Sequence, residues 1–249
     1  MNHCGPGLSL DDRIFSAAWS STEDHIVTLF DDGILRKWSN IFEAPTLVAH
    51  STQRHNNATF EFSPDDRFIA SALGGAKLWD ASNLSLIWEY TGYWNSITFH
   101  PLGKRLVFYS GRSSLDVNIE DLGNITATER QFNRYTYNFV FNPSGNMCVA
   151  RTSRGVRILS ADTFEEKTSL PYSDCEAIRI TPNGKYVLLV LGSKKVVLWD
   201  ITAERTVEEL SLDMNVSSIA QISRNCRVLL AYNYFMNNQH IIHLASTYY

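Results

Sequence analysis

The 249-residue sequence has no long hydrophobic run and no marked excess of charge of either sign. Nowhere do eighteen apolar residues follow one another, and residues 1–10 lack the basic and apolar regions of a secretion signal. The 22 Lys and Arg residues stand against 26 Asp and Glu residues, which gives a net charge of −4 and makes nucleic acid an unfavourable partner. We therefore expect a soluble, non-secreted protein of the cytoplasm or nucleus.

Cysteine is scarce, and the motifs of common active sites are missing. The four cysteines are spread over the chain without paired spacing, which indicates reduced thiols and neither a disulfide framework nor a zinc site. The sequence contains no H-E-x-x-H, no G-x-S-x-G and no G-x-x-x-x-G-K-[ST]. His240 and His243 lie three residues apart, a spacing that points two rings to opposite faces of a strand. We predict no catalytic residue, no metal and no cofactor.

The sequence does contain an internal repeat of about forty residues. Each copy has an alternating apolar segment, a turn, a second apolar run, another turn and a third run. The residue directly before the first turn of each copy is its anchor residue. The six anchor residues are Ser20, Ser63, His100, Asn142, Thr181 and Ser223, and they are separated by 43, 37, 42, 39 and 42 positions. A period near forty is typical of a four-stranded propeller blade.

The first turn of four copies has the residues that a tight turn requires. Proline follows the anchor residue, and Asp or Gly comes two positions later; these pairs are Pro64 and Asp66, Pro101 and Gly103, Pro143 and Gly145, and Pro182 and Gly184. The second runs are rich in β-branched and aromatic residues, which fit strands buried on both faces. No stretch has sustained helical periodicity, so we expect little or no helix.

These patterns predict an all-β protein, a β-propeller of about six four-stranded antiparallel blades, or seven if the chain is a fragment. One such sheet cannot bury both of its faces alone, whereas sheets packed radially cover one another. The whole chain, 1–249, is then one domain with repeats near 14–50, 58–91, 96–130, 138–171, 177–211 and 218–246. The last copy supplies three strands, which a short strand near Leu8–Leu10 would complete.

Two of the copies close with Trp-Asp, at Trp79-Asp80 and Trp199-Asp200, and Ser63-Pro64-Asp65-Asp66 forms a first turn. These residues resemble the WD-repeat family, over nearly the whole chain. The resemblance implies a buried network of His, Ser, Asp and Trp. In the second copy His50, Ser71 and Trp79 match three of its positions, and in the first copy Asp32 and Trp38 keep the spacing. The Gly-His pair of the family is absent, and Glu120, Leu159 and Leu244 lie near the Trp position elsewhere.

The resemblance also implies an interaction scaffold or adaptor that binds a peptide or domain at its rim and top face, and not an enzyme. The connections between blades and the turns between second and third strands emerge on one face. Their aromatic and basic residues are Tyr93, Trp94, Arg112, Arg134, Tyr135, Tyr137, Arg154, Lys194 and Lys195. Such side chains anchor interfaces and pair with carboxylates or phosphates. We predict that they bind other proteins through acidic or phosphorylated segments.

Other interpretations of the same residues stay open at this point. An aromatic side chain in such a connection also suits a cap over a neighbouring blade's core, and lysines in turns are usually solvated. A propeller subunit that binds RNA in a ribonucleoprotein complex is the main alternative function, and a propeller enzyme is a weaker one. The partner's identity and the oligomeric state do not follow from the sequence.

Overall fold

The computed structural model describes residues 14–20, 25–30, 34–39, 45, 47–50, 59–72, 75–192, 194–212, 218–222, 228–233 and 238–243. Every element within these ranges is a β-strand, and all of the sheets are antiparallel. The prediction of an all-β, antiparallel protein is confirmed for this part of the chain. No helix long and apolar enough to cross a membrane occurs among the same residues.

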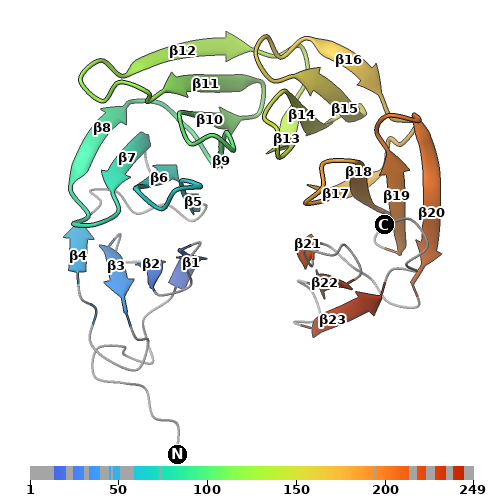
Figure 1. Cartoon of the computed structure of the whole chain (residues 1–249), viewed down its shortest axis with the longest axis horizontal. Helices are drawn as coiled ribbons and strands as arrows, with labels where there is room; N and C mark the ends of the chain where they lie inside the picture. Colours follow the sequence, from blue (N-terminus) through green and yellow to red (C-terminus); the bar gives the residue numbers. More distant parts are fainter. Residues whose placement is uncertain are drawn as a thin grey trace, which may run out of the picture. The chain divides into compact units, whose positions relative to one another are not determined.

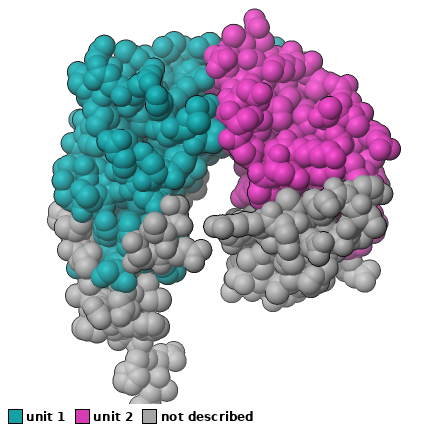
Figure 2. Space-filling view, viewed as in Figure 1, with its two compact units in different colours: residues 1–133 teal, residues 134–249 magenta. Residues whose placement is uncertain are grey.

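The chain forms two compact units, residues 1–133 and residues 134–249, which Figure 2 colours separately. The first unit holds three four-stranded sheets, each a simple up-and-down meander (Figure 1). Their strands are β1 (Ile14–Trp19), β2 (Ile26–Phe30), β3 (Ile34–Trp38), β4 (Leu47–His50), β5 (Thr59–Phe62), β6 (Phe68–Ala72), β7 (Ala76–Asp80), β8 (Leu86–Tyr90), β9 (Ser96–Phe99), β10 (Arg105–Ser110), β11 (Ser113–Asn118) and β12 (Thr126–Gln131). The first strands β1, β5 and β9 are neighbours in that order.

The second unit repeats this arrangement with two four-stranded sheets and one of three strands. Their strands are β13 (Thr136–Phe141), β14 (Met147–Thr152), β15 (Gly155–Ser160), β16 (Glu166–Ser169), β17 (Cys175–Ile180), β18 (Tyr186–Leu191), β19 (Lys195–Asp200), β20 (Arg205–Ser211), β21 (Ser218–Ile222), β22 (Val228–Asn233) and β23 (Asn238–His243). The first strands β13, β17 and β21 are again neighbours. The segment Leu8–Leu10, expected to complete the last sheet, lies outside the described residues.

The proline turns all close in one way. The residue two positions after each proline has positive φ, and its N–H donates to the carbonyl of the anchor residue at 2.7–2.9 Å; the four are Asp66, Gly103, Gly145 and Gly184. A positive φ favours Gly and tolerates Asp, which explains the choice of residues at this position. In three of these turns the side chain of the residue before proline also accepts from the first N–H of the second strand, as Thr181 Oγ1 does from Tyr186 at 3.1 Å.

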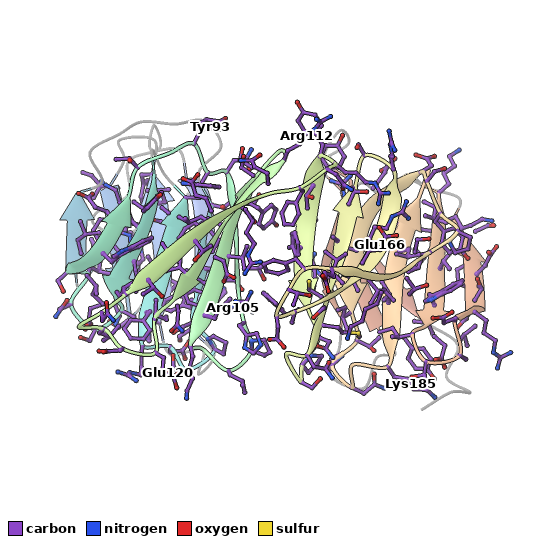
Figure 3. All side chains as sticks on the ribbon, turned by 90° about the horizontal axis from the view of Figure 1, so that it is seen from above. Tyr93, Arg105, Arg112, Glu120, Glu166 and Lys185 are labelled. Carbon is purple, nitrogen blue, oxygen red and sulfur yellow. The ribbon has the colours of Figure 1, made fainter. Side chains whose placement is uncertain are left out.

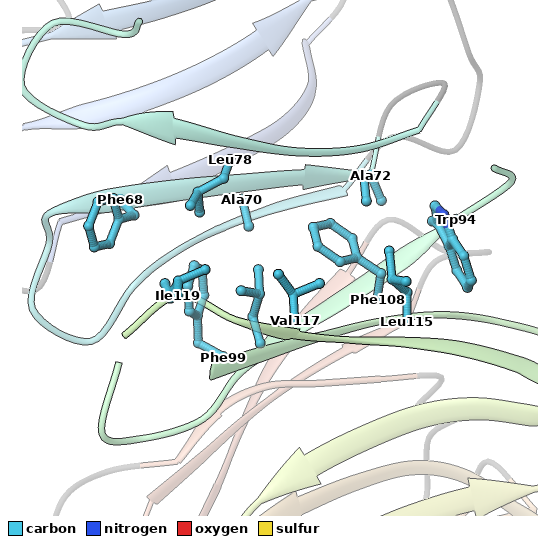
Figure 4. Packing of buried hydrophobic residues seen from close by; sticks show 12 residues of the cluster. Phe68, Ala70, Ala72, Leu78, Trp94, Phe99, Phe108, Leu115, Val117 and Ile119 are labelled. Carbon is cyan, nitrogen blue, oxygen red and sulfur yellow. The ribbon is translucent and has the colours of Figure 1, made fainter. Parts of the chain in front are cut away.

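The middle sheet of the first unit is covered on both faces. Phe68, Ala70 and Leu78 of β6 and β7 pack against β9–β11, in the cluster shown in Figure 4. The alternate residues Ile69 and Trp79 pack toward Val27 and Leu29 of β2 and Leu35 of β3. All five residues of β6 are consequently buried, as expected for a strand between two layers.

The middle sheet of the second unit packs in the same way against the preceding sheet. Val187 and Leu189 of β18 pack with Val149 and Ile158 of the preceding sheet. The alternate residues of β18 and β19 form a second cluster, composed of Tyr186, Leu188, Val190, Val196 and Leu198 together with Ala177 of β17. In both units, apolar faces that alternate along the strands hold the sheets together.

Two of the three tryptophans near the ends of third strands are anchored by a hydroxyl group. Trp38 Nε1 donates to Thr28 Oγ1 at 2.7 Å, and Trp79 Nε1 donates to Ser71 Oγ at 2.8 Å. The strand register places Leu189 at the corresponding position beside Trp199. Trp199 Nε1 is accordingly buried with no acceptor among the described residues.

The aspartates of the Trp-Asp pairs organise turns. Asp80 Oδ1 accepts from the backbone N–H of Ser82 at 2.7 Å, and Asp200 Oδ1 accepts from the N–H groups of Thr202 and Ala203. The side-chain hydrogen bond from Ser82 lowers the pKa of Asp80. Asp32 lies outside the described residues, and so does the side chain of His50, so their predicted place in a polar network is not described.

The indole hydrogen bonds predict a measurable stability difference. Thr28→Val keeps the shape of the side chain but leaves Trp38 Nε1 buried without its acceptor, and Ser71→Ala does the same to Trp79. Each substitution should lower the free energy of unfolding by about 1–3 kcal/mol in urea denaturation, because an unmet buried donor costs that much. The exposed Thr128 on β12 provides the control, since Thr128→Val should change stability by less than about 0.5 kcal/mol. Equal effects for Thr28→Val and Thr128→Val would contradict this assignment.

Candidate protein-binding surface

One end of the second unit gathers exposed aromatic and basic side chains. Here the connection after β12 meets the β14–β15 turn, and the Ser153 N–H donates to the Tyr135 carbonyl at 2.8 Å. The β18–β19 turn joins the same end, since the Gly192 N–H donates to the Asp174 carbonyl just before β17. We call this region, formed by Tyr135, Tyr137, Arg151, Arg154 and Lys194, the loop end of the second unit. Lys185 lies at the opposite end of the same sheets (Figure 3).

A β-bulge presents Tyr137. Thr136 faces Thr152 and Asn138 faces Arg151, so Tyr137 is an extra residue on β13. Bulges of this kind bend the strand and redirect a side chain, and they are frequent beside functional sites. Glu176 is the extra residue at the same place on the neighbouring first strand, β17. The extra residues of the two bulges, Tyr137 and Glu176, therefore both lie at the loop end of their strands.

Tyr135 and Tyr137 are the exposed aromatic residues of this surface. Their exposed fractions are 51% and 50%, which is unusually large for tyrosine side chains next to a packed core. Arg154 and Lys194 are also exposed, and neither makes an ion pair with any residue that the structure describes. Aromatic area and unpaired positive charge thus occur together here.

One residue that connects this surface, Arg151, was not predicted from the sequence. Its guanidinium carbon lies 4.8 Å from the centre of the Tyr137 ring, and its Nη1 donates to the Cys175 carbonyl at 3.3 Å. Arg151 therefore joins the first strands of two neighbouring sheets. In the sequence, Arg151 is a charged residue directly after the apolar second run of its repeat. Such a position is expected at the edge of the core.

Two predicted basic residues form ion pairs with carboxylates of the same unit. Arg134 Nη1 contacts Glu166 Oε2 at 2.8 Å, and Glu166 also pairs with Arg157 at 3.3 Å. Lys195 Nζ pairs with Glu209 at 2.9 Å. These side chains have internal partners and are less available to another protein than Arg154 and Lys194.

In the first unit, the predicted residues divide differently. Tyr93 is 68% exposed and Arg112 is exposed, and both lie at one end of the strands, opposite Glu120 (Figure 3). Trp94 is only 6% exposed and belongs to the core cluster of β6–β11. It packs over Gly92, where an added Cβ would lie 2.6 Å from the indole nitrogen. Trp94 therefore caps the core and is not part of an exposed surface, which corrects the expectation for this residue.

A cavity of about 420 Å³ opens at the opposite end of the first unit. It is lined by Lys37, Arg67, Asp80 and Leu122 among others, and Lys37 Nζ donates to the Ala81 carbonyl at 2.7 Å. Both acidic and basic residues line its wall, so the cavity does not favour a ligand of either charge. Within the described ranges, no group of three His, Cys, Asp or Glu residues is placed to hold a metal ion.

Cys175 lies beneath the loop end, and its thiol is poorly reactive. Burial raises the pKa of its thiol to about 12, and the positive charge of Arg151 opposes that rise. Because the thiolate is the nucleophilic form, a thiol that stays protonated near neutral pH is a poor nucleophile. Cys175 thus serves packing, and its Sγ donates to the Ala177 carbonyl at 3.3 Å.

No protein-family model and no curated protein sequence matches this chain. Evidence for the function therefore comes from the geometry and charge of the surface itself.

The raised pKa of Cys175 predicts a loss of stability at high pH. The unfolded thiol ionises near 9.0 and the folded thiol near 12, so the folded state is stabilised below pH 9 and loses this contribution between those values. At pH 10 the loss is about 1.4 kcal/mol. Unfolding free energies of the wild type and Cys175→Ala should therefore converge by about this amount between pH 7.5 and 10. A gap that stays constant over this range would show that the thiol is not shifted.

Proposed function

We propose that this chain is a WD-repeat-like β-propeller scaffold whose six sheets are its blades. Three observations support this architecture: each sheet falls within one sequence repeat, each is an up-and-down meander, and neighbouring first strands lie side by side within each unit. Apolar faces on both sides of the middle sheets fit radial packing. In such a scaffold, function resides in the connections at the ends of the strands.

We further propose that the loop end of the second unit binds an acidic or phosphorylated segment of another protein. The observation that carries this proposal is the combination of two half-exposed tyrosines with two basic side chains that lack ion pairs among the described residues. Tyrosine supplies a large contact area at a small entropic cost, and arginine pairs with carboxylates and phosphates. Because both basic side chains are exposed and hold no carboxylate among the described residues, they are available to an anionic partner.

The ion pairs of Arg134 and Lys195 help to define which basic residues contact an acidic segment. Arg134 and Lys195 are held in ion pairs with Glu166 and Glu209, so they are less available to an anionic partner. Arg154 and Lys194 remain as the charges that steer an anionic segment toward the tyrosines. An extended acidic segment would lie across the β14–β15 and β18–β19 turns.

Charge reversal tests this proposal on the full chain. Immobilised wild-type protein should retain acidic or phosphorylated members of a synthetic peptide library and release neutral ones. Arg154→Glu combined with Lys194→Glu should reduce retention at least about tenfold, because two favourable charge contacts become repulsive. Retention should also fall as salt is raised, since the surface is exposed.

Lys167→Glu combined with Arg205→Glu is the matched control for this experiment. Lys167 on β16 and Arg205 on β20 are exposed in the same unit and are not part of the loop end, so this double variant has the same change of charge without altering that surface. Unchanged retention by the variant reversed at Arg154 and Lys194 would refute the proposed contact. Retention of RNA in place of peptides, with a steep salt dependence, would favour the nucleic-acid interpretation.

A further inference from the structure

An exposed serine lies next to the turns that carry the basic residues of the loop end. Ser173 belongs to the connection between β16 and β17, and its side chain makes no hydrogen bond to any residue that the structure describes. A Cβ added to Gly155 would lie 3.4 Å from the Ser173 Cα, so this connection touches the β14–β15 turn. Arg154 directly precedes Gly155, and adjacent Cα atoms are about 3.8 Å apart. A group attached to the Ser173 hydroxyl would therefore lie within reach of the Arg154 side chain.

The second basic turn contacts the next residue of the same connection. The Gly192 N–H donates to the Asp174 carbonyl at 3.3 Å, and a Cβ added to Gly192 would lie 3.3 Å from Asp174 Oδ2. Lys194 follows two positions later in this turn. Neither Arg154 nor Lys194 has an ion pair with a described residue, so both are available to a phosphate group on residue 173.

The residues that follow Ser173 suit it to a kinase that prefers acidic substrates. Asp174 and Glu176 are the first and third residues after the serine. A Ser/Thr kinase with a basic substrate groove selects such a pattern by charge complementarity. Pro171, Ser173 and Asp174 are all exposed, so the hydroxyl group is accessible to an enzyme.

We propose that Ser173 is a phosphorylation site for such a Ser/Thr kinase, and that its phosphate pairs with Arg154 and Lys194 and prevents the loop end from binding anionic segments. In the transfer, Ser173 Oγ forms a bond to the γ-phosphorus of ATP, and the bond from that phosphorus to the bridging oxygen breaks. ADP leaves, and the hydroxyl proton passes to the catalytic carboxylate of the kinase. This inference rests on the proposed function, because it names the modification that controls the same surface.

The charge balance at the loop end explains why one phosphate is sufficient. Three cations, Arg151, Arg154 and Lys194, stand against the carboxylates of Asp174 and Glu176, which leaves a single net positive charge. A phosphoserine carries about −1.5 to −2 charges at pH 7. Phosphorylation therefore reverses the sign of the local charge, and an anionic partner is repelled instead of attracted. Because the two carboxylates oppose the phosphate, its pairing depends on both Arg154 and Lys194.

Phosphorus NMR of the full chain tests this pairing without any peptide. Phosphoserine is incorporated at position 173 through an expanded genetic code, and its second pKa, about 6 when isolated, is measured by titration. Arg154→Gln combined with Lys194→Gln should raise this pKa by about 0.3–1.5, because the dianion loses two cations. Phosphoserine at position 144 is the matched control. Ser144 is exposed in the β13–β14 turn, at the opposite end of the unit, so its pKa should not respond to the double substitution.

Kinase treatment and peptide retention test the modification and its effect. An acid-directed Ser/Thr kinase with ATP should add one phosphate that mass spectrometry locates at Ser173. Ser144, which is followed by neutral residues, should stay unmodified. Asp174→Asn combined with Glu176→Gln should slow the transfer at least about tenfold. Phosphoserine at position 173 should lower retention of the acidic library peptides at least about tenfold, and phosphoserine at position 144 should not.

The outcomes separate this inference from the proposed function. The inference alone is overturned if the kinase leaves Ser173 unmodified, if the phosphate pKa ignores the loss of Arg154 and Lys194, or if retained peptides are unaffected by phosphoserine at position 173. Failure of the unmodified chain to retain acidic peptides, together with a phosphate pKa that does respond to the double substitution, overturns the proposed function and supports the phosphate contact.

Discussion

Burial of one sheet's apolar face against the next is the interaction on which the rest of this structure depends. In β6 and β18 the side chains alternate between two apolar clusters, and those of β6 pack against neighbouring sheets on both sides. Burial contributes roughly 25 cal/mol for each Å² of apolar surface, and no polar contact among the described residues approaches the sum over these faces. Because the faces are used for packing, the ends and outer edges of the sheets remain for binding.

The elements that the sequence predicts well are those with a local cause. Proline followed by Asp or Gly specifies the first turns, and the positive φ at Asp66 and Gly145 explains why those residues occur there. The apolar second runs similarly predict doubly covered strands such as β18. The periodicity of the sequence does not predict the bulge at Tyr137, because one inserted residue bends the strand without changing its apolar composition.

The candidate surface was predictable only in part, and the reasons are again physical. A position in a connection does not determine whether an aromatic ring points outward. Tyr93 is exposed while the adjacent Trp94 packs over Gly92 into the core. Nor does the sequence indicate which charges are paired, since Arg134 meets Glu166 across 32 positions of chain. Arg151 was missed because its importance comes from two contacts, with Tyr137 and Cys175, that only the fold creates.

Some buried hydrogen-bond donors inside the sheets have an acceptor and others do not. Thr28 and Ser71 satisfy a buried indole, whereas Leu189 leaves Trp199 Nε1 without an acceptor and adds apolar area to the core instead. Since a buried orphan donor is tolerated where packing around it is extensive, stability alone does not require every polar group to be met. The Nε atoms of Arg134, Arg151 and Arg157 are likewise buried with no hydrogen-bond acceptor among the described residues. Because several arginines share this state, an unmet Nε does not by itself indicate a ligand.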